Sequence, residues 1–313
     1  MAYRFKTFSD LPQEMCDEIV DVGHKSPHYL KSCALVHRSL RHRAQGHLFK
    51  SVNLSTFDRV VRLVEIVENN SQVAQYISDI RITFAGAVRE EEIDTSLAFL
   101  LKLIKQSSPA YPSFPKLSII QDLPDKHFPD EPYKCRITFR ETTQCLVGVT
   151  HLCLKDVLDF PAVLLRRFKK LTNLTVINSH FDLPLYSLDR PKCSESLPSI
   201  TDIHIEHTDQ FPSFLISCCP ELKNLSIDRV TFYPPQIEAA SSVFPYFPKI
   251  THLKFSRCNV ATILALGQSV VDLSRLRCVS NVVDGSCNEK QTEEEIQCRD
   301  HIMQLTRVSL QDV

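Results

Sequence analysis

The sequence predicts an α/β protein in two parts: a short three-helix module in residues 1–50 and an irregular solenoid with a parallel curved sheet in residues 51–313. Three observations predict this. Apolar residues recur with helical spacing in the first fifty residues. From there on, a short strand-like pattern recurs, and from Val149 onward it returns every 22 to 32 residues. The length of 313 residues also suits about two domains.

The composition is that of an ordinary folded chain. Hydrophobic residues make up 43% and charged residues 23%, and the formal net charge is −1. That charge gives no overall attraction to nucleic acid or to an anionic membrane. No apolar run approaches the roughly 18 residues of a membrane span, and no apolar signal segment is visible. We therefore expect a cytoplasmic or nuclear protein that binds neither membrane nor nucleic acid.

Glycine and cysteine usage argues against cofactor and metal sites. The chain has six glycines, and no two lie within ten residues of each other. Phosphate-binding loops and nucleophile elbows need clustered glycines, because only glycine lets the backbone approach a ligand so closely. The twelve cysteines form no C-x-x-C pair and are expected to be reduced and buried. Cys298 and His301 come nearest to a metal motif, but ordinary helix residues explain them better. We expect no cofactor, no metal and no catalytic activity.

Residues 8–50 are expected to form three short helices. Gly23 is placed to end the first, and Pro12 suits its first turn. The expected caps are Ser9 or Asp10, Ser26 and Ser39. The expected apolar stripes are Met15, Ile19 and Val22; Leu30, Cys33, Ala34 and His37; and Leu40, Ala44 and Leu48. Three helices of about ten residues bury little surface, so a partner protein or the rest of the chain should cover part of them.

Two segments of this module resemble the F-box motif. Leu11-Pro12-Gln13-Glu14-Met15 matches its LP-x-E opening, and residues 30–38 match its L-x-x-C-x-L-V-x-R segment, in the form found in mushroom-forming fungi. The resemblance implies docking on a Skp-type adaptor of a cullin–RING ubiquitin ligase. It implies adaptor-binding or module-core roles for Leu11, Pro12, Met15, Ile19, Leu30, Leu35, Val36 and Leu40. The family usually carries Trp near position 40, where this chain has Leu40.

A basic stretch overlaps this module. Between Asp21 and Asp58 there is no acidic residue, but there are six basic ones: Lys25, Lys31, Arg38, Arg41, Arg43 and Lys50. The first 60 residues hold nine Lys or Arg and six Asp or Glu, so their net charge is only +3. No interleaved aromatic residues indicate base stacking. The stretch is better explained as a solvated face, or as a complement to an acidic adaptor, than as a nucleic-acid site.

From residue 50 onward one pattern recurs: apolar, two variable, apolar, one variable, apolar. Its instances are Ile77/Ile80/Ile82, Phe114/Leu117/Ile119, Val149/Leu152/Leu154, Leu171/Leu174/Val176, Ile200/Ile203/Ile205, Leu222/Leu225/Ile227, Ile250/Leu253/Phe255, Leu273/Leu276/Cys278 and Leu305/Val308/Leu310. Alternating apolar residues make a strand with one buried side. Repeating that strand with a helix-sized segment between stacks parallel strands into a solenoid.

The pattern resembles the L-x-x-L-x-L of leucine-rich repeats. The family's Asn/Cys position is Cys in one unit and is otherwise occupied by Val157, Ser179, Thr208 and Val230. Other groups must then satisfy the turns, so we expect irregular repeats with helices opposite the sheet. Longer helices are expected at residues 57–68, 91–105 and 288–305. The chain stops at Val313 directly after a repeat strand, which raises the alternative that the solenoid is truncated at its C-terminal end.

The exposed strand face is the candidate binding surface, because its side chains alternate outward from the core. The candidate target-binding residues are His151, Cys153, Asn173, Thr175, Asp202, His204, Asn224, Ser226, His252 and Lys254. A histidine ladder for metal binding and a His–Cys nucleophile on this face are weaker interpretations, since variable repeat positions are expected to be polar.

The resulting hypothesis is a non-catalytic substrate-recognition subunit of a cullin–RING ubiquitin ligase. The N-terminal module would dock a Skp-type adaptor, and the solenoid would hold an unidentified target protein. One alternative is a repeat scaffold outside any ligase, whose helical module only caps the solenoid. Another is an enzyme on an irregular α/β fold, which requires a deep pocket with convergent reactive groups.

Overall fold

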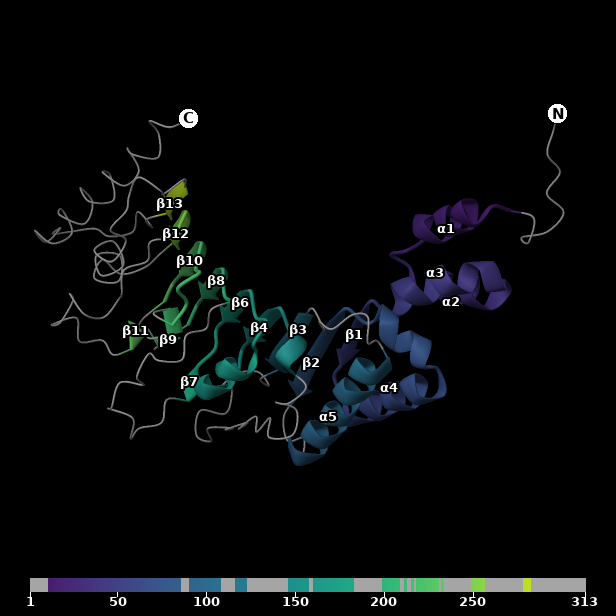
Figure 1. Ribbon diagram of the computed structural model, residues 1–313, viewed down its shortest axis with the longest axis horizontal. Helices are drawn as coiled ribbons and strands as arrows, with labels where there is room; N and C mark the ends of the chain where they lie inside the picture. The colour runs from purple at the N-terminus through teal and green to yellow at the C-terminus, as the bar shows by residue number, and fades with distance from the viewer. Residues whose placement is uncertain are drawn as a thin grey trace, which may run out of the picture.

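A helical head and a curved parallel sheet make up the computed structural model (Figure 1). The structure describes residues 11–85, 90–107, 116–122, 146–157, 160–182, 199–208, 211–212, 215–216, 218–230, 232–233, 249–256 and 278–282. The sheet has nine strands in the order β1-β2-β3-β4-β6-β8-β10-β12-β13, and the pairings between them are parallel. The fold is therefore α/β, with N-terminal helices followed by a leucine-rich-repeat-like stack, as the sequence predicts.

The head contains the three predicted helices, α1 (Gln13–Val22), α2 (Pro27–Val36) and α3 (Arg38–Phe49). Ser26 caps α2 as expected, because its side chain accepts a hydrogen bond from the Tyr29 backbone N–H at 3.3 Å. The predicted cap of α3 was wrong. Only His37 separates α2 from α3, so His37 is the cap, and its Nδ1 accepts from the Ser39 N–H at 3.2 Å. Pro12 precedes α1, and the expected caps Ser9 and Asp10 lie outside the described residues.

A hydrophobic cluster of its own holds the head together. Its buried members are Cys16, Val20, Leu30, Cys33, Leu40 and Ala44. The predicted stripes of α2 and α3 supply four of these, but the stripe predicted for α1 was wrong. Met15 and Val22 are 43% and 88% exposed, because α1 turns the neighbouring face, with Cys16 and Val20, into the cluster.

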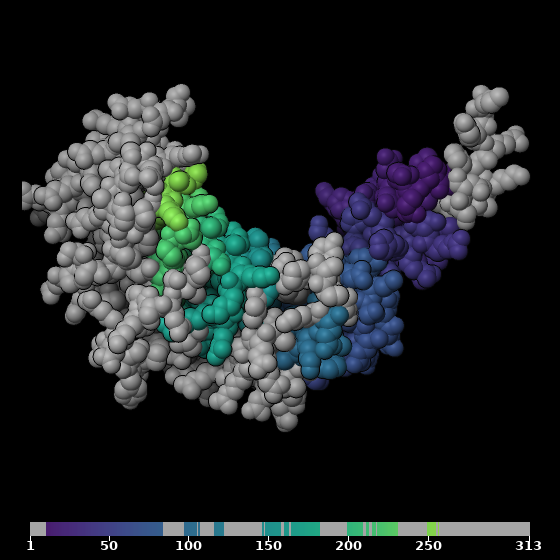
Figure 2. Space-filling view, viewed as in Figure 1, coloured from purple at the N-terminus to yellow at the C-terminus, as the bar shows by residue number. Residues whose placement is uncertain are grey.

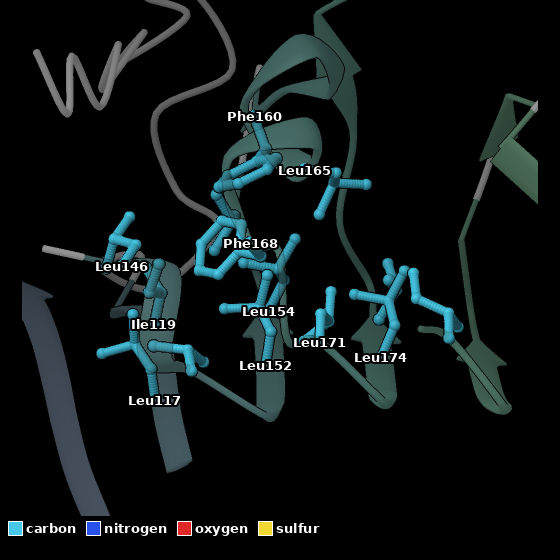
Figure 3. Close-up of a cluster of buried hydrophobic side chains, with 14 of the residues drawn as sticks. Leu117, Ile119, Leu146, Leu152, Leu154, Phe160, Leu165, Phe168, Leu171 and Leu174 are labelled. Atoms are coloured by element: carbon cyan, nitrogen blue, oxygen red, sulfur yellow. The ribbon is translucent and has the colours of Figure 1, made fainter. Parts of the chain in front are cut away.

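The strands of the main sheet follow the repeat pattern closely. They are β1 (Ser51–Leu54), β2 (Asp79–Ala85), β3 (Lys116–Asp122), β4 (His151–Lys155), β6 (Asn173–Ile177), β8 (Asp202–Glu206), β10 (Asn224–Asp228), β12 (His252–Ser256) and β13 (Cys278–Val282). Figure 3 shows Leu152 and Leu154 of β4 between Leu117 and Leu174 of the neighbouring strands. Each buried leucine or isoleucine meets its counterpart in register, so the core continues from strand to strand.

Two strands differ from the prediction. β1 was not predicted, because a four-residue strand with one buried side chain, Leu54, is too short to show the pattern. β13 begins at Cys278, and its register pairs Leu253 with Val279. The triplet assigned to Leu273/Leu276/Cys278 was therefore placed three residues too early. The expected triplet at residues 305–310 and the helix at residues 288–305 lie outside the described residues, as do Cys298 and His301.

Two predicted helices cover the outer side of the first strands (Figure 1). They are α4 (Phe57–Asn69) and α5 (Glu90–Ser107). The 3₁₀ helix η2 (Ser71–Tyr76) follows α4, and the 3₁₀ helix η4 (Leu146–Gly148) precedes β4. The amphipathic pattern of α4 buries Val60, Leu63 and Val67 toward the sheet. The helices predicted at residues 57–68 and 91–105 are thus confirmed.

Further along the described chain, the outer layer is only partly helical. It contains a 3₁₀ helix, η5 (Ala162–Arg167), helical residues at 215–216, and the short parallel pairs β5 (Phe160–Pro161) with β7 (Phe181–Asp182) and β9 (Phe211–Pro212) with β11 (Phe232–Tyr233). Phe160, Phe181 and Phe211 stack edge to face, with ring centroids 5.9 and 5.4 Å apart. One large aromatic ring per repeat fills the space under the sheet, so a short segment can replace a helix there.

A left-handed residue ends four of the repeat strands: Asp156, Asn178, His207 and Arg229, with φ between 46° and 55°. Their N–H groups donate to carbonyls of the next strand at 2.8–3.0 Å. The following position is the one that carries Asn or Cys in leucine-rich repeats. There the buried Ser179 accepts from the Val157 N–H at 3.1 Å and donates to the Ile177 carbonyl at 2.7 Å. At this turn, the serine thus makes the hydrogen bonds to backbone groups that Asn makes in leucine-rich repeats.

The head joins the solenoid through α3, which contacts β1 and η2. The Tyr76 hydroxyl hydrogen-bonds His42 Nδ1, and the two rings meet edge on with centroids 5.2 Å apart. Backbone N–H groups of Ser78 and Asp79 donate to the Lys50 carbonyl. Among the described residues, the two hydrophobic clusters are separate, and the division at residue 50 stays a prediction. In the described part of the chain, every helix is too short or too polar to cross a bilayer.

Candidate functional site

The candidate target-binding residues lie in two rows across the exposed side of the sheet. The first row contains His151, Asn173, Asp202, Asn224 and His252, and the second contains Cys153, Thr175, His204, Ser226 and Lys254. Each row runs at right angles to the strands, one residue per strand. The parallel register therefore brings together all ten residues singled out in the sequence, which come from positions up to 103 residues apart.

Eight of these residues line an open hollow of about 410 Å³ over β6, β8, β10 and β12. Figure 2 shows a broader concavity of the molecule between the purple head and the teal and green strands. His151 and Cys153 belong to the rows but lie outside the lining of this hollow. The hollow is open, a form that suits contact with part of a macromolecule.

Hydrogen bonds from the preceding threonines hold the first row in place. Thr172 Oγ1 donates to Asn173 Oδ1 at 2.7 Å, and Thr251 Oγ1 lies 2.9 Å from His252 Nδ1. Asp202 accepts from Thr201 Oγ1 and from the Asn224 amide, a contact that crosses from β8 to β10. The polar groups of the row are thus oriented before any partner arrives, which lowers the entropic cost of binding.

The second row offers a thiol that is not activated. Burial raises the pKa of Cys153, and the positive charges of Lys116, Arg81 and Lys155 oppose that rise without cancelling it. A nucleophilic cysteine needs a lowered pKa, because the thiolate is the reactive form. Cys153 therefore acts as a small, weakly polar member of the surface.

Three further polar residues, which the sequence did not single out, lie at the end of the strands beside the second row. Glu206 and Asp228 are in register on β8 and β10, and His207 follows Glu206. His207 Nδ1 is 3.2 Å from Glu206 Oε1, and His204 Nε2 is 3.5 Å from Glu206 Oε2. The run His-Ile-Glu-His at 204–207 was visible in the sequence. Its meeting with Asp228 depends on the strand register and was not.

The residues matched to the F-box motif divide into core and surface. Leu30 and Leu40 are buried in the head cluster, and Leu11 packs against it. Ile19 is partly buried. The four exposed members are Pro12, Met15, Leu35 and Val36, and the last two are 82% and 63% exposed.

The exposed members gather at one edge of the head. Gln13 Nε2, in the first turn of α1, donates to the Ser39 carbonyl at 3.0 Å, which ties that turn to the start of α3. Because one residue links α2 to α3, Leu35 and Val36 also lie at this junction. We call Pro12, Met15, Leu35 and Val36 the apolar edge. Arg38 and Arg41 are exposed beside it at the start of α3, where Arg41 Nε donates to the Ala34 carbonyl at 3.2 Å, and the exposed Lys31 lies one turn before Leu35.

An ion-pair cluster fixes α1 against α3 at the other end of the head. Arg43 donates to both carboxylate oxygens of Asp21, at 2.8 and 2.7 Å, and His47 Nε2 is 2.7 Å from Asp21 Oδ1. These contacts, with Arg43 contributing most, hold the pKa of Asp21 well below its usual range. They orient the helix that carries Pro12 and Met15.

No family model matches the chain, and no curated protein matches it, so the resemblance to the F-box motif stays a hypothesis. Among solved structures, the crystal structure of the Rad7 and Elc1 complex in yeast contains a similar chain. The two share 11% sequence identity, and the alignment covers 86% of this chain and 68% of that one with a TM-score of 0.35. A likeness of this strength carries no conclusion about the partners or activity of the present chain.

Proposed function

We propose that this protein is a non-catalytic substrate-recognition subunit of a cullin–RING ubiquitin ligase. The head, residues 1–50, would dock a Skp-type adaptor through its apolar edge. The solenoid, residues 51–313, would hold a target protein on its two polar rows. The contribution of such a subunit is effective concentration: it keeps the target near the ubiquitin carrier and makes no bond itself.

One observation carries the proposal: the division of the motif-matched residues between the core and the surface of the head. Leu30 and Leu40 are buried, whereas Leu35 and Val36 are exposed although they belong to the same apolar run. Exposed apolar residues that gather at one edge indicate a contact surface. The surrounding exposed arginines and lysines favour an acidic partner, which they would steer by charge.

Support for the second half of the proposal comes from the polar rows. A continuous, pre-oriented set of donors and acceptors over four strands can recognise the surface or an extended segment of another protein. The rows mix acidic, basic and neutral groups, so a target protein would be recognised by the arrangement of its donors and acceptors rather than by its charge alone.

The decisive experiment measures binding of the full chain to a purified Skp-type adaptor by calorimetry. The test variant is Leu35→Ser with Val36→Ser, because both side chains are exposed and their loss leaves the head cluster intact. If the adaptor buries both side chains, their removal costs about 2 kcal/mol or more, or roughly a 30-fold weaker Kd. Leu11→Ala with Pro12→Ala should also weaken binding.

Val22→Ser is the matched control. Val22 is apolar and 88% exposed like Leu35, but it ends α1 away from the apolar edge, so this variant should bind as the wild type does. Equal binding by the wild type, both double variants and Val22→Ser would refute docking through the edge.

The same measurement distinguishes adaptor docking from the alternative that the protein is a repeat scaffold outside any ligase. The contact of α3 with β1 and η2 favours that alternative. If the head only caps the solenoid, the wild type will show no adaptor binding. A chain lacking residues 1–50 will then expose its first repeats and aggregate.

A further inference from the structure

A group of metal-ligating side chains lies at the ends of β8 and β10, next to the polar rows. Glu206, His207 and Asp228 each offer one ligand atom, and these atoms lie within 4.8 Å of one another. The group contains an imidazole nitrogen and two carboxylates, so it differs from a surface cluster of acidic residues alone. Glu206 and Asp228 are half-buried and His207 is exposed, which leaves the group open on one side.

The backbone brings these three residues together. Glu206 and Asp228 occupy the same register position on neighbouring parallel strands. His207 adopts a left-handed conformation with φ of 49°, and its N–H donates to the Asp228 carbonyl at 2.8 Å. Histidine has a Cβ, so this conformation carries a small cost that the turn must offset. The strand ends thus fix the Cα positions of the three residues and leave only side-chain rotation for binding.

The one short distance in the group, between His207 and Glu206, suits a cation of the zinc class. Two ligands about 2.0–2.1 Å from a tetrahedral zinc ion lie roughly 3.3 Å apart, and His207 Nδ1 lies 3.2 Å from Glu206 Oε1. The other oxygen of Glu206 faces His204 Nε2 at 3.5 Å, which is the arrangement of an outer partner that orients a ligating carboxylate. Imidazole favours zinc-like ions over Mg²⁺ and Ca²⁺, which prefer all-oxygen sites.

Electrostatics point the same way. Carboxylates directly opposite each other on paired strands repel and destabilise the pair. A divalent cation between Glu206 and Asp228 would attract both carboxylates.

We propose that Glu206, His207 and Asp228 bind a divalent transition-metal ion, with Zn²⁺ as the best-fitting case. His204 positions Glu206 by contacting the carboxylate oxygen that does not bind the ion. A fourth coordination position stays open to solvent or to a donor atom of a bound protein. His204 also lines the hollow, so the ion would lie at its rim. The proposal is independent of adaptor docking and of the ligase function.

The test is calorimetric titration of the full chain with Zn²⁺, with the thiols kept reduced. The variants are Glu206→Gln, which keeps the size of the side chain, and His207→Asn, because asparagine readily adopts the left-handed conformation. His252→Asn is the control, since His252 is an exposed histidine of the same sheet that lies outside the group. Circular dichroism checks that each variant remains folded.

The wild type and His252→Asn should share one binding step with the same Kd. Glu206→Gln and His207→Asn should weaken that step by at least about tenfold, the loss that even an outer partner of a metal site causes. Titration with Co²⁺ provides a second readout, because its visible absorption reports a low-coordinate nitrogen and oxygen environment that the two site variants should lack. If the wild type shows no such step, or if all four proteins bind Zn²⁺ equally, the site does not exist.

Discussion

Replacing Gly23 by alanine should loosen the head through Tyr29. Gly23 ends α1 with φ of −102°, which alanine tolerates, so the backbone conformation is not the obstacle. A Cβ added there would lie within 2.6 Å of Tyr29 Cγ and would overlap the ring. Tyr29 must then move, and it would lose the hydrogen bond from its hydroxyl to the Ile19 carbonyl, now 2.7 Å long.

The magnitude follows from three contributions. Overpacking costs about 1–3 kcal/mol and the lost hydrogen bond about 1 kcal/mol, while the lower entropy of the unfolded alanine chain returns about 0.4–1 kcal/mol. The net destabilisation is about 1–3 kcal/mol. That is a large share of the folding free energy of a module of about 40 residues, at roughly 0.1 kcal/mol per residue.

Hydrogen exchange in the full chain measures this effect locally. A loss of about 2 kcal/mol should speed exchange of the α1 and α2 amides by roughly 30-fold. Gly46→Ala is the matched control, because its Cβ would meet Tyr76 Cδ1 at an ordinary 3.8 Å. On a Tyr29→Ser background, Gly23→Ala should lose its effect. Unchanged exchange in Gly23→Ala, or an equal effect with and without the tyrosine ring, would refute the reasoning.

Two further predictions concern a turn and an ion pair. Ser179→Ala should destabilise the solenoid by about 1–3 kcal/mol, measured by thermal unfolding, because the buried Val157 N–H loses the serine hydroxyl that accepts its hydrogen bond. An unchanged melting temperature would contradict this role. Asp21, paired with Arg43 and His47, has a lowered pKa in the folded head, so its stabilisation is present above its ordinary value of 3.8 and is lost as pH falls through and below that value. The opening equilibrium of the α1 amides, obtained by dividing each exchange rate by the intrinsic rate at the same pH, should therefore rise more steeply from pH 5 to pH 3 in the wild type than in Asp21→Asn, and parallel curves would refute the coupling.

The sequence predicted the sheet well because one rule governs each strand. Alternation in a triplet such as Leu152 and Leu154 is a local property, and a buried face demands it in every repeat. The face of α1 that carries Cys16 was not predictable in this way, since Met15 and Ile19 fit a helical stripe equally well and only packing against α3 decides between them. The short outer segments after α5 escaped prediction for a related reason: an aromatic ring such as Phe160 fills the space by stacking on the ring of another repeat.

The candidate surface was predictable where it depends on alternation and not where it depends on turns. His151 and Asn173 could be assigned to the exposed face from position alone, and the register then aligned them. The group around Glu206 depends on a left-handed residue after the strand, which has no mark in the sequence when glycine is absent. The apolar edge was predictable in part. The resemblance to the motif indicated its residues, but not which of the motif-matched residues are buried.

The left-handed residues that end the repeat strands have a consequence for how this protein can change. Main-chain hydrogen bonds set the course of the chain at Asp156, Asn178, His207 and Arg229, and all four side chains differ. The backbone there imposes a conformation but no particular chemistry. Substitutions at these corners can therefore give the border of the sheet a new charge or ligand set while the path of the polypeptide stays the same, so recognition and architecture can vary separately.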